Sequence, residues 1–401
     1  MTSTSQMESP VAFSAAQAEE RNGMVLKTLA AAAFLVFFNA YMVAPLIPAL
    51  SREFGATARS MGWVVPAYVL PYGLSTLFYG PLSDRAGRRK VLLILLPLSA
   101  LTTLLVSLAW SIQSLIVLRI LSGLTAGGIV TISLALIGDL YPYQRLGRAL
   151  GWMFGAIAGG MAFGATLGAW LNPYLGWRNE FIILAGANGA LAIVLYKLRG
   201  LFNGRAPNPA AFKEVWHGYA ALLKNPRGAK TFSFILLNGL FHGGVFSWLG
   251  FLLSQRYHLN DEGIGKALLG YGIPGLFMGP VLGRLADRFG RRRIIPAGFL
   301  LASACALSLV PASPLWTVTV IVTALSFCLD MTHPLMAGIV ADLDPKRRGQ
   351  AMGLNAFSIF AGFGTGAILF QLLLDRGFPV ALTVFGGVQF VLGVLAFRIF
   401  R

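Results

Sequence analysis

The sequence predicts an all-α membrane protein in which twelve transmembrane helices form two pseudo-symmetric bundles of six. Three observations lead to this prediction: an apolar composition, a series of apolar runs of roughly 20 residues or more, and a residue cluster that occurs twice. Charged residues make up 12% of the 401 residues, hydrophobic residues make up 56%, and the mean hydropathy is +0.70. Because a soluble chain carries roughly 25% charged residues, this composition indicates a membrane protein.

The apolar runs follow one another along the whole chain, and each is long enough to cross a bilayer as a helix. The first run follows a polar stretch, residues 1–24, which we expect to be a disordered cytoplasmic tail, and it is too long for the apolar region of a signal peptide. The second and eighth runs end at one duplicated cluster, and the fourth and tenth end at another. The predicted spans are Val25–Leu50, Met61–Leu82, Val91–Trp110, Ile112–Leu140, Gly147–Leu171, Phe181–Leu198, Thr231–Ser254, Gly263–Leu285, Ile294–Pro311, Leu315–Val340, Ala351–Leu374 and Pro379–Phe400.

The duplicated clusters divide the chain into two related halves. The stretch "GPLSDRAGRR", Gly80–Arg89, returns 203 positions later as "GRLADRFGRR", Gly283–Arg292. At the same offset, Asp139, Pro142 and Arg145 recur as Asp342, Pro345 and Arg348. Two matches at one offset indicate an internal duplication, with six helices in each half. We therefore expect one bundle at residues 25–199 and the other at 231–401.

Charge between the apolar runs predicts how the chain is oriented. The loops on one side, together with both termini, carry 25 Lys and Arg residues, and the loops on the other side carry 6. By the positive-inside rule, both termini are expected in the cytoplasm, and we expect a multi-pass protein of the inner membrane. The net charge of +17 falls in these short clusters, so it does not indicate a nucleic-acid-binding surface.

The longest connection, residues 200–230, is a predicted cytoplasmic linker between the bundles. Six of its apolar side chains share one helical face, which predicts an interfacial helix lying under the membrane, with a flexible linker as the alternative. These side chains are Phe212, Val215, Trp216, Tyr219, Leu222 and Leu223.

The first duplicated cluster resembles the loop signature of the major facilitator superfamily, G-x-L-x-D-R-x-G-R-R, and the second is similar to its second-half copy. "RILSGLTAGG", Arg119–Gly128, is similar to the R-x-x-Q-G motif of the fourth helix, with Ser122 in place of Gln, and "GWRNEF", Gly176–Phe181, resembles the loop that enters the sixth. The resemblance implies a transporter rather than an enzyme, working by alternating access without a cofactor. It also implies that the first, fourth, seventh and tenth helices line a central cavity.

The loop signature itself is interpreted as a gate on the cytoplasmic side. Asp84 can pair with Arg88 one helical turn away, and Gly80 is expected to let the second helix approach a neighbour closely. The resemblance implies that this cluster meets the eleventh helix. Loops that only fix the topology remain the alternative reading. The expected gating residues are Gly80, Asp84, Arg85, Gly87, Arg88, Arg89, Gly283, Asp287 and Arg288.

Glycines repeat at every fourth position in the fifth predicted span, at 151, 155 and 159 and again at 160, 164 and 168. The eighth span carries a similar stripe at Gly275, Gly279 and Gly283. Small residues let helices approach closely, so we expect these two spans to pack together between the halves. "GATLGAWL", Gly164–Leu171, is similar to the antiporter motif of drug exporters, except that Ala165 and Ala169 replace two of its residues.

Ionisable residues deep in the spans are costly in a bilayer and therefore indicate function. Asp330, His333, Arg119 and His242 are the candidates for proton coupling, with Asp330 as the proton carrier. The expected substrate cavity includes Asn39, Tyr41, Asn238, His242 and Phe246, with Phe37, Phe38, Tyr68, Tyr72, Phe241 and Trp248 as further candidates. For any one of these residues, a purely structural hydrogen bond or a lipid-facing position is the alternative.

These features predict a monomeric secondary transporter whose partners are a small-molecule substrate, protons and the lipid bilayer. Proton-coupled efflux of small amphipathic or drug-like molecules is the first reading, and proton-coupled uptake of a sugar or another metabolite is the second. A divalent metal carrier that uses His242, Asp330 and His333 as ligands is a third. The sequence has no G-x-x-x-x-G-K-[ST] loop, which disfavours ATP-driven transport.

Overall fold

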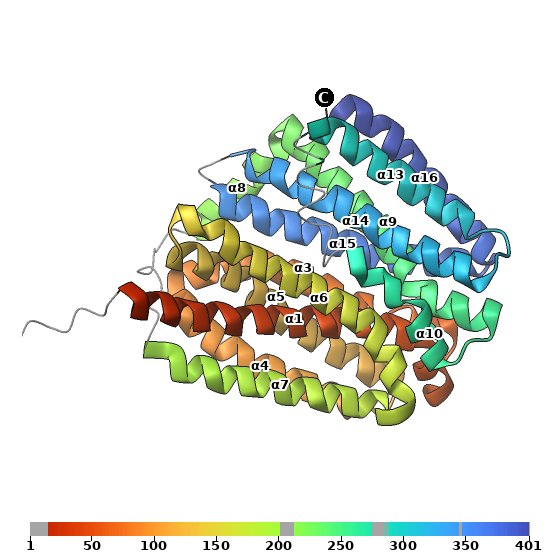
Figure 1. Cartoon of the computed structure of the whole chain (residues 1–401), viewed down its shortest axis with the longest axis horizontal. Helices are drawn as coiled ribbons and strands as arrows, with labels where there is room; N and C mark the ends of the chain where they lie inside the picture. Colours follow the sequence, from red (N-terminus) through yellow and green to blue (C-terminus); the bar gives the residue numbers. More distant parts are fainter. Residues whose placement is uncertain (1–14, 201–211, 275–284, 286–287, 345–346, 401) are drawn as a thin grey trace, which may run out of the picture.

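The computed structural model describes residues 15–200, 212–274, 285, 288–344 and 347–400, and the regular elements in these ranges are all helical (Figure 1). The first half contains α1 (Ala15–Phe54), α2 (Ala58–Met61), α3 (Pro66–Ala86), α4 (Arg88–Ser107), α5 (Ile112–Leu140), α6 (Tyr143–Leu175), α7 (Trp177–Lys197) and η1 (Leu198–Gly200). The linker contains α8 (Phe212–Lys224), and the second half contains α9 (Pro226–Tyr257), α10 (Asp261–Ala267), η2 (Leu269–Gly272), α13 (Arg291–Ser308), α14 (Leu315–Ala341), α15 (Arg348–Leu374) and α16 (Phe378–Ile399).

The predicted all-α membrane fold is confirmed. Nine helices within the described ranges are long and apolar enough to cross a membrane, and they match predicted spans one, three to seven and ten to twelve. α3 and α13 occupy the positions of spans two and nine, and α13 begins with three consecutive arginines. Span eight begins with α10 and η2, and most of its remainder, residues 275–284, lies outside the described residues.

The first helix begins earlier than the sequence analysis expected. α1 starts at Ala15, so residues 15–24 are helical rather than part of a disordered tail. The segment "AAQAEER" consists of strong helix formers, and Asn22 donates a hydrogen bond to the carbonyl of Leu140 at 3.3 Å, which ties this end to α5.

The two halves repeat the same packing order. In the first half α1 packs on α6 and α4 packs on α7, and in the second half α9 packs on α15 and α13 packs on α16 (Figure 1). These are the first–fifth and third–sixth helix pairs of each half. The halves meet where α3 contacts α15, where α1 contacts α9, and where α6 contacts α10 and η2.

Glycines set the spacing within each half. A Cβ at Gly164 would lie 2.6 Å from the Phe38 carbonyl oxygen, and one at Gly168 would lie 2.8 Å from the Met42 Cβ. Among the described residues, Gly164 and Gly168 therefore pack on α1, a contact that the sequence analysis did not predict for their stripe. In the second half, Gly243 approaches the backbone of Phe363 in the same way.

The expected contact between the fifth and eighth spans is nevertheless present at one end. Thr166 of α6 donates a hydrogen bond to the Leu268 carbonyl at 3.3 Å, and a Cβ at Gly265 would lie 2.8 Å from the Thr166 carbonyl oxygen. The glycines that make this contact are in α10 and η2. The stripe predicted for it, Gly275, Gly279 and Gly283, lies outside the described residues.

The linker contains the expected amphipathic helix, α8, but protein covers the centre of its apolar face. Val215, Tyr219 and Leu222 are buried, while Trp216 and Leu223 remain exposed. The Tyr219 hydroxyl donates a hydrogen bond to the Leu77 carbonyl of α3 at 3.0 Å. In a helix this carbonyl would accept from the N–H of residue 81, which is proline and has none. α8 also contacts α15, so it links the two halves beneath their junction.

Candidate functional site

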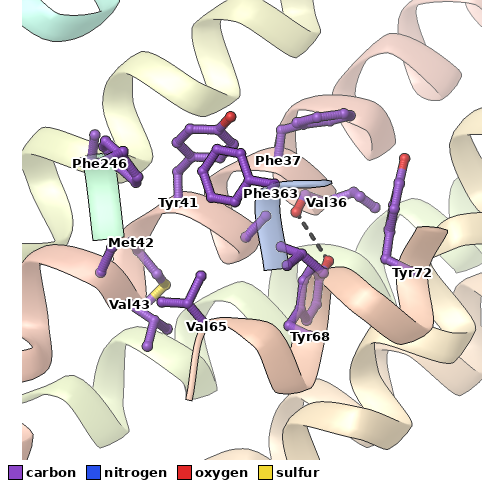
Figure 2. Packing of buried hydrophobic residues seen from close by; sticks show 14 of the residues in the cluster. Val36, Phe37, Tyr41, Met42, Val43, Val65, Tyr68, Tyr72, Phe246 and Phe363 are labelled. Carbon is purple, nitrogen blue, oxygen red and sulfur yellow. Dashed lines mark hydrogen bonds between the residues drawn. The ribbon is translucent and has the colours of Figure 1, made fainter. Parts of the chain in front are cut away.

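Aromatic side chains from both halves meet between α1, α9 and α15 (Figure 2). The ring of Tyr41 on α1 lies 5.0 Å from that of Phe246 on α9 and 5.7 Å from that of Phe363 on α15. The ring of Tyr271 of η2 also contacts that of Phe246, with ring centroids 4.6 Å apart. The structure thus brings together Tyr41 and Phe246, two predicted cavity residues, and adds two aromatic residues that the sequence analysis did not select.

The aromatic contact continues along α3 and α15. Tyr72 lies edge-on to Phe360 with ring centroids 4.5 Å apart, and Phe37 of α1 lies 6.0 Å from Phe360. Tyr68 and Tyr72 stack one turn apart, and the Tyr68 hydroxyl donates to the Val36 carbonyl at 3.1 Å (Figure 2). Phe37, Tyr68 and Tyr72 are buried, so in this structure the aromatic rings pack against one another across the interface between the halves.

Arg119 is completely buried in the first half. Its Nη1 donates to the side-chain oxygen of Asn39 at 2.5 Å and to the Asn39 carbonyl at 3.3 Å, and its guanidinium lies 4.3 Å from the ring centre of Tyr68. Its Nε and Nη2 have no hydrogen-bond partner. Asn39 in turn donates to Thr103 at 3.3 Å. A permanently charged group is thus held by neutral partners, which fixes its position without neutralising its charge.

Asp330, on α14, belongs to the second half. Its Oδ2 is buried and has no hydrogen-bond partner, and the carboxyl group is near enough to Tyr41 and Tyr271 to interact with them electrostatically. His333, one turn along α14, interacts electrostatically with His242 of α9. His333 Nδ1 and His242 Nε2 are also buried without partners. The predicted set therefore falls into two parts: Asp330 and the two histidines in the second half, and Arg119 in the first.

Asn238 has a clear structural role. It donates to Thr332 of α14 at 2.9 Å and accepts from Gln389 of α16 at 3.2 Å, so it joins three helices of the second half. Its place in a substrate cavity stays a prediction. The sequence analysis missed Thr332 and Gln389, although Gln389 is a polar residue within an apolar run, which is the signal that would have identified it.

The metal-carrier reading finds no support in the described part of the chain. There, no group of three or more His, Cys, Asp or Glu side chains is arranged to hold a metal ion. A transition-metal site needs several such ligands converging on one point. His242, Asp330 and His333 do not form one.

The loop signature forms an ion-pair network at the other end of α3. Arg88 binds Asp84 at 3.1 Å, as the four-residue spacing predicts, and it also binds Asp139 of α5 at 2.5 Å. The second half repeats this geometry, because Arg291 lies 3.5 Å from Asp342, and both residues are 203 positions further along. Within the described residues these pairs join helices of the same half. The direct contact between α3 and α15 lies about two turns away, where Thr76 donates to the Gly353 carbonyl at 3.3 Å.

The glycines of the signature have different roles from the one expected. A Cβ at Gly80 would meet no atom within 4 Å, so the predicted close approach at Gly80 is not made in this structure. Gly87 has φ = 91° and Gly290 has φ = 79°, so each forms the turn between two helices in a conformation that favours glycine. Among the other expected gating residues, Arg89 donates to the Arg199 carbonyl at 2.9 Å. Arg85 and Arg288 are exposed. Gly283 and Asp287 lie outside the described residues.

Comparisons with known proteins agree with this architecture. The family model described as Major Facilitator Superfamily matches residues 29–279 and 252–401. The chain is 27% identical to the uncharacterized MFS-type transporter YceJ of Bacillus subtilis, covering 91% of this chain and 93% of that protein. It is 24% identical to the quinolone resistance protein NorA of Staphylococcus aureus, covering 85% and 88%.

Solved structures show the same fold at low sequence identity. The human organic anion transporter MFSD10 superposes with a TM-score of 0.73 at 18% identity, covering 95% of this chain and 99% of that one. A bacterial homolog of the human lysosomal transporter Spinster, in an inward-facing and unoccupied conformation, gives the same TM-score at 17% identity, covering 95% and 98%.

Proposed function

The chain belongs to the Major Facilitator Superfamily of transporters, and we propose that it exports small amphipathic or drug-like molecules in exchange for protons. The proposal rests on the carboxyl group of Asp330. This carboxyl group interacts electrostatically with Tyr41 of the opposite half and has a buried oxygen with no hydrogen-bond partner. By sequence it is the one acid near the middle of any predicted span.

The way in which the halves are joined supports alternating access. Each half has its own internal packing, and the halves touch through a limited set of helices, α3 with α15 and α1 with α9 among them. Rocking one half against the other would open the aromatic interface to one side of the membrane at a time. Both termini and the linker are assigned to the cytoplasm on the strength of the Lys and Arg asymmetry, in the inner membrane of a bacterial cell, with the monomer as the working unit.

The walls of the interface support an amphipathic substrate. Tyr41, Phe246, Phe363 and Tyr72 present ring faces and edges that can adapt to differently shaped apolar molecules. The similarity to a quinolone resistance protein fits this class, since such a molecule combines an aromatic body with polar groups. A sugar would need many hydrogen-bonding groups, and the described lining offers few. Uptake of a sugar or another metabolite is therefore the second candidate.

Coupling rests on competition for Asp330. A charged carboxylate at mid-membrane costs about 2.5–3.5 kcal/mol on insertion scales, so an empty site favours the protonated form. When substrate enters and displaces the proton, its polar group or the nearby histidines stabilise the carboxylate. Arg119 keeps its charge throughout and biases this exchange from the first half. One proton then enters for each substrate molecule that leaves.

The test is transport in proteoliposomes with an imposed pH gradient, assayed in both directions with a panel of amphipathic and sugar substrates. Asp330→Asn imitates the protonated form, so we expect it to abolish gradient-driven transport and to spare substrate binding. His333→Ala should shift the pH optimum and keep coupling, because the histidine only tunes its neighbour. Asp375→Asn, at an exposed acid after α15, is the matched control. Full gradient-driven transport by Asp330→Asn at wild-type density would remove Asp330 as the coupling site.

A further inference from the structure

A contact between the halves closes the end of the molecule opposite the loop signatures. Arg52 at the end of α1 binds both carboxylate oxygens of Asp261 on α10, at 2.8 and 3.0 Å, and Asn172 of α6 donates to the same group at 2.9 Å. Arg52 and Asn172 belong to the first half, and Asp261 belongs to the second. We call these three residues the outer gate.

The ends of α1, α7 and α10 hold one more acid than base among the side chains that the structure describes. They contribute three bases and four acids, while the end of α6 contributes Tyr174 and that of α4 contributes no ionisable group. The bases and acids are Arg52, Glu53, Arg178, Glu180, Asp261, Glu262 and Lys266. The end of α9, which also contacts α1 and α10, adds Arg256 and the exposed His258, and Arg256 donates to the carbonyls of Leu309, Val310 and Pro311.

Three ion pairs use all three bases. Arg52 binds Asp261, and Lys266 binds Glu262 at 2.6 Å. Arg178 binds Glu53, which also accepts from the indole N–H of Trp177. Arg178 also donates from Nη2 to the Ala109 carbonyl at 2.9 Å. One acid, Glu180, is left over.

Glu180 is also the most enclosed of the four acids. Its side chain is 5% exposed, and both carboxylate oxygens are buried with no hydrogen-bond partner. Its electrostatic neighbour is Asp261, which carries the same charge. Removing a charge from water costs several kcal/mol when nothing compensates it, and a like charge nearby adds to that cost. The closed gate therefore favours Glu180 in a neutral form.

A proton is the cation that fits this site. Calcium and magnesium take six or more oxygen ligands, whereas Glu180 is here the one carboxylate not already engaged, because Arg52 and Asn172 occupy the oxygens of Asp261. We propose that Glu180 is a proton-binding site of the outer gate, occupied while the gate is closed and emptied when the gate opens.

The gate would then respond to protons in a definite direction. Opening admits water to Glu180, which can release its proton to that water and ionise. A proton from outside must return before the carboxyl group is buried again, so low pH favours closure and high pH favours opening. The inference rests on the proposed alternating access. It adds a second proton site, remote from Asp330, that makes outer closure depend on proton uptake.

The test follows the gate directly, by measuring the distance between two spin labels on the full-length protein in lipid nanodiscs. Tyr174→Cys at the end of α6 and Gln255→Cys at the end of α9 place exposed labels on opposite halves, while the native cysteines, Cys305 and Cys328, are buried. In this labelled parent, the open-to-closed ratio should rise by up to about tenfold per pH unit over the range in which Glu180 releases its proton.

Substitutions assign this response to Glu180. Glu180→Gln cannot release a proton, so the gate should stay closed at high pH, with an open-to-closed ratio at least about tenfold below that of the parent. Arg52→Gln breaks the gate itself and should open it at every pH, which shows that the labels report opening. Glu262→Gln, at a partly exposed acid on α10 that is paired with Lys266, is the matched control and should behave like the parent.

Three results would overturn the inference: a parent gate that ignores pH, a Glu180→Gln gate that keeps the pH response of the parent, or a gate that follows sodium at constant pH. Failure of the proposed function looks different. Asp330→Asn should retain the pH response of the gate, so loss of coupled transport in that variant and loss of gate response in Glu180→Gln are separate outcomes.

Discussion

Removing the hydroxyl of Tyr219 should loosen the linker helix from the bundle. This hydroxyl donates to the Leu77 carbonyl at 3.0 Å, and Pro81 supplies no N–H to replace it. Leu77 is 8% exposed, so water does not readily take over. Leaving a buried acceptor unsatisfied costs about 1–3 kcal/mol, which corresponds to a factor of about 5 to 140 in the equilibrium between docked and undocked α8.

Hydrogen exchange of the α8 amides measures that equilibrium, because these amides exchange when the helix detaches and unwinds. In Tyr219→Phe we expect exchange over Phe212–Lys224 to accelerate by the same factor. Tyr174→Phe, at a tyrosine that is 69% exposed, is the matched control and should leave exchange unchanged.

Pro81→Ala tests the reason for the effect. Alanine restores an N–H that can reach the Leu77 carbonyl within α3, so Tyr219→Phe should cost much less in this background. If Tyr219→Phe leaves exchange unchanged, or accelerates it equally with Pro81 and with Ala at position 81, the reasoning is refuted.

The pH dependence of this contact has a definite sign. Burial raises the pKa of Tyr219 to about 12, so the hydroxyl remains a donor throughout the physiological range. Since the folded-state pKa lies above the usual value of about 10, the stabilisation is complete below about pH 10 and is lost as the pH rises through about 12. The ratio of exchange rates between Tyr219→Phe and wild type should therefore be equal at pH 6 and pH 8.

Two further predictions concern packing and the cytoplasmic gate. Gly164→Ala should destabilise the protein by about 1–3 kcal/mol, because its Cβ would meet the Phe38 backbone at 2.6 Å. Gly155→Ala, whose Cβ would have open space, is the control and should be neutral. Equal unfolding temperatures of the two variants in detergent would contradict this. Asp84→Asn should slow turnover by up to about fivefold, the equivalent of the ~1 kcal/mol of an exposed ion pair, while insertion and substrate affinity stay largely intact. Arg88 keeps its ion pair with Asp139 in this variant. A fall in turnover of more than about fivefold would therefore mean that Asp84 makes a second contact in another state. Transport equal to that of wild type, at equal membrane abundance, would argue against gating.

The duplication in the sequence predicts contacts that the structure repeats in both halves. The offset of 203 positions relates Arg88 and Asp139 to Arg291 and Asp342, and the structure pairs both sets. Short-range patterns of this kind are readable because a bilayer forces its helices to be long, apolar and internally hydrogen-bonded. The apolar spans follow from that constraint, and nine of them match long apolar helices in the described residues. The two halves follow from the duplication, and the pair of Asp84 with Arg88 follows from its four-residue spacing.

Contacts between distant helices depended on the tertiary structure. The sequence gives no indication that Asn238 bonds Gln389, 151 positions away, or that Gly80 faces open space while Gly164 packs against α1. Such contacts depend on how each helix is rotated about its axis, and a helix that is apolar all round has no periodic pattern to reveal its rotation. The same holds for Glu180. The sequence by itself shows an acid at the start of the sixth span, and only the pairing of its neighbours leaves that acid buried and alone.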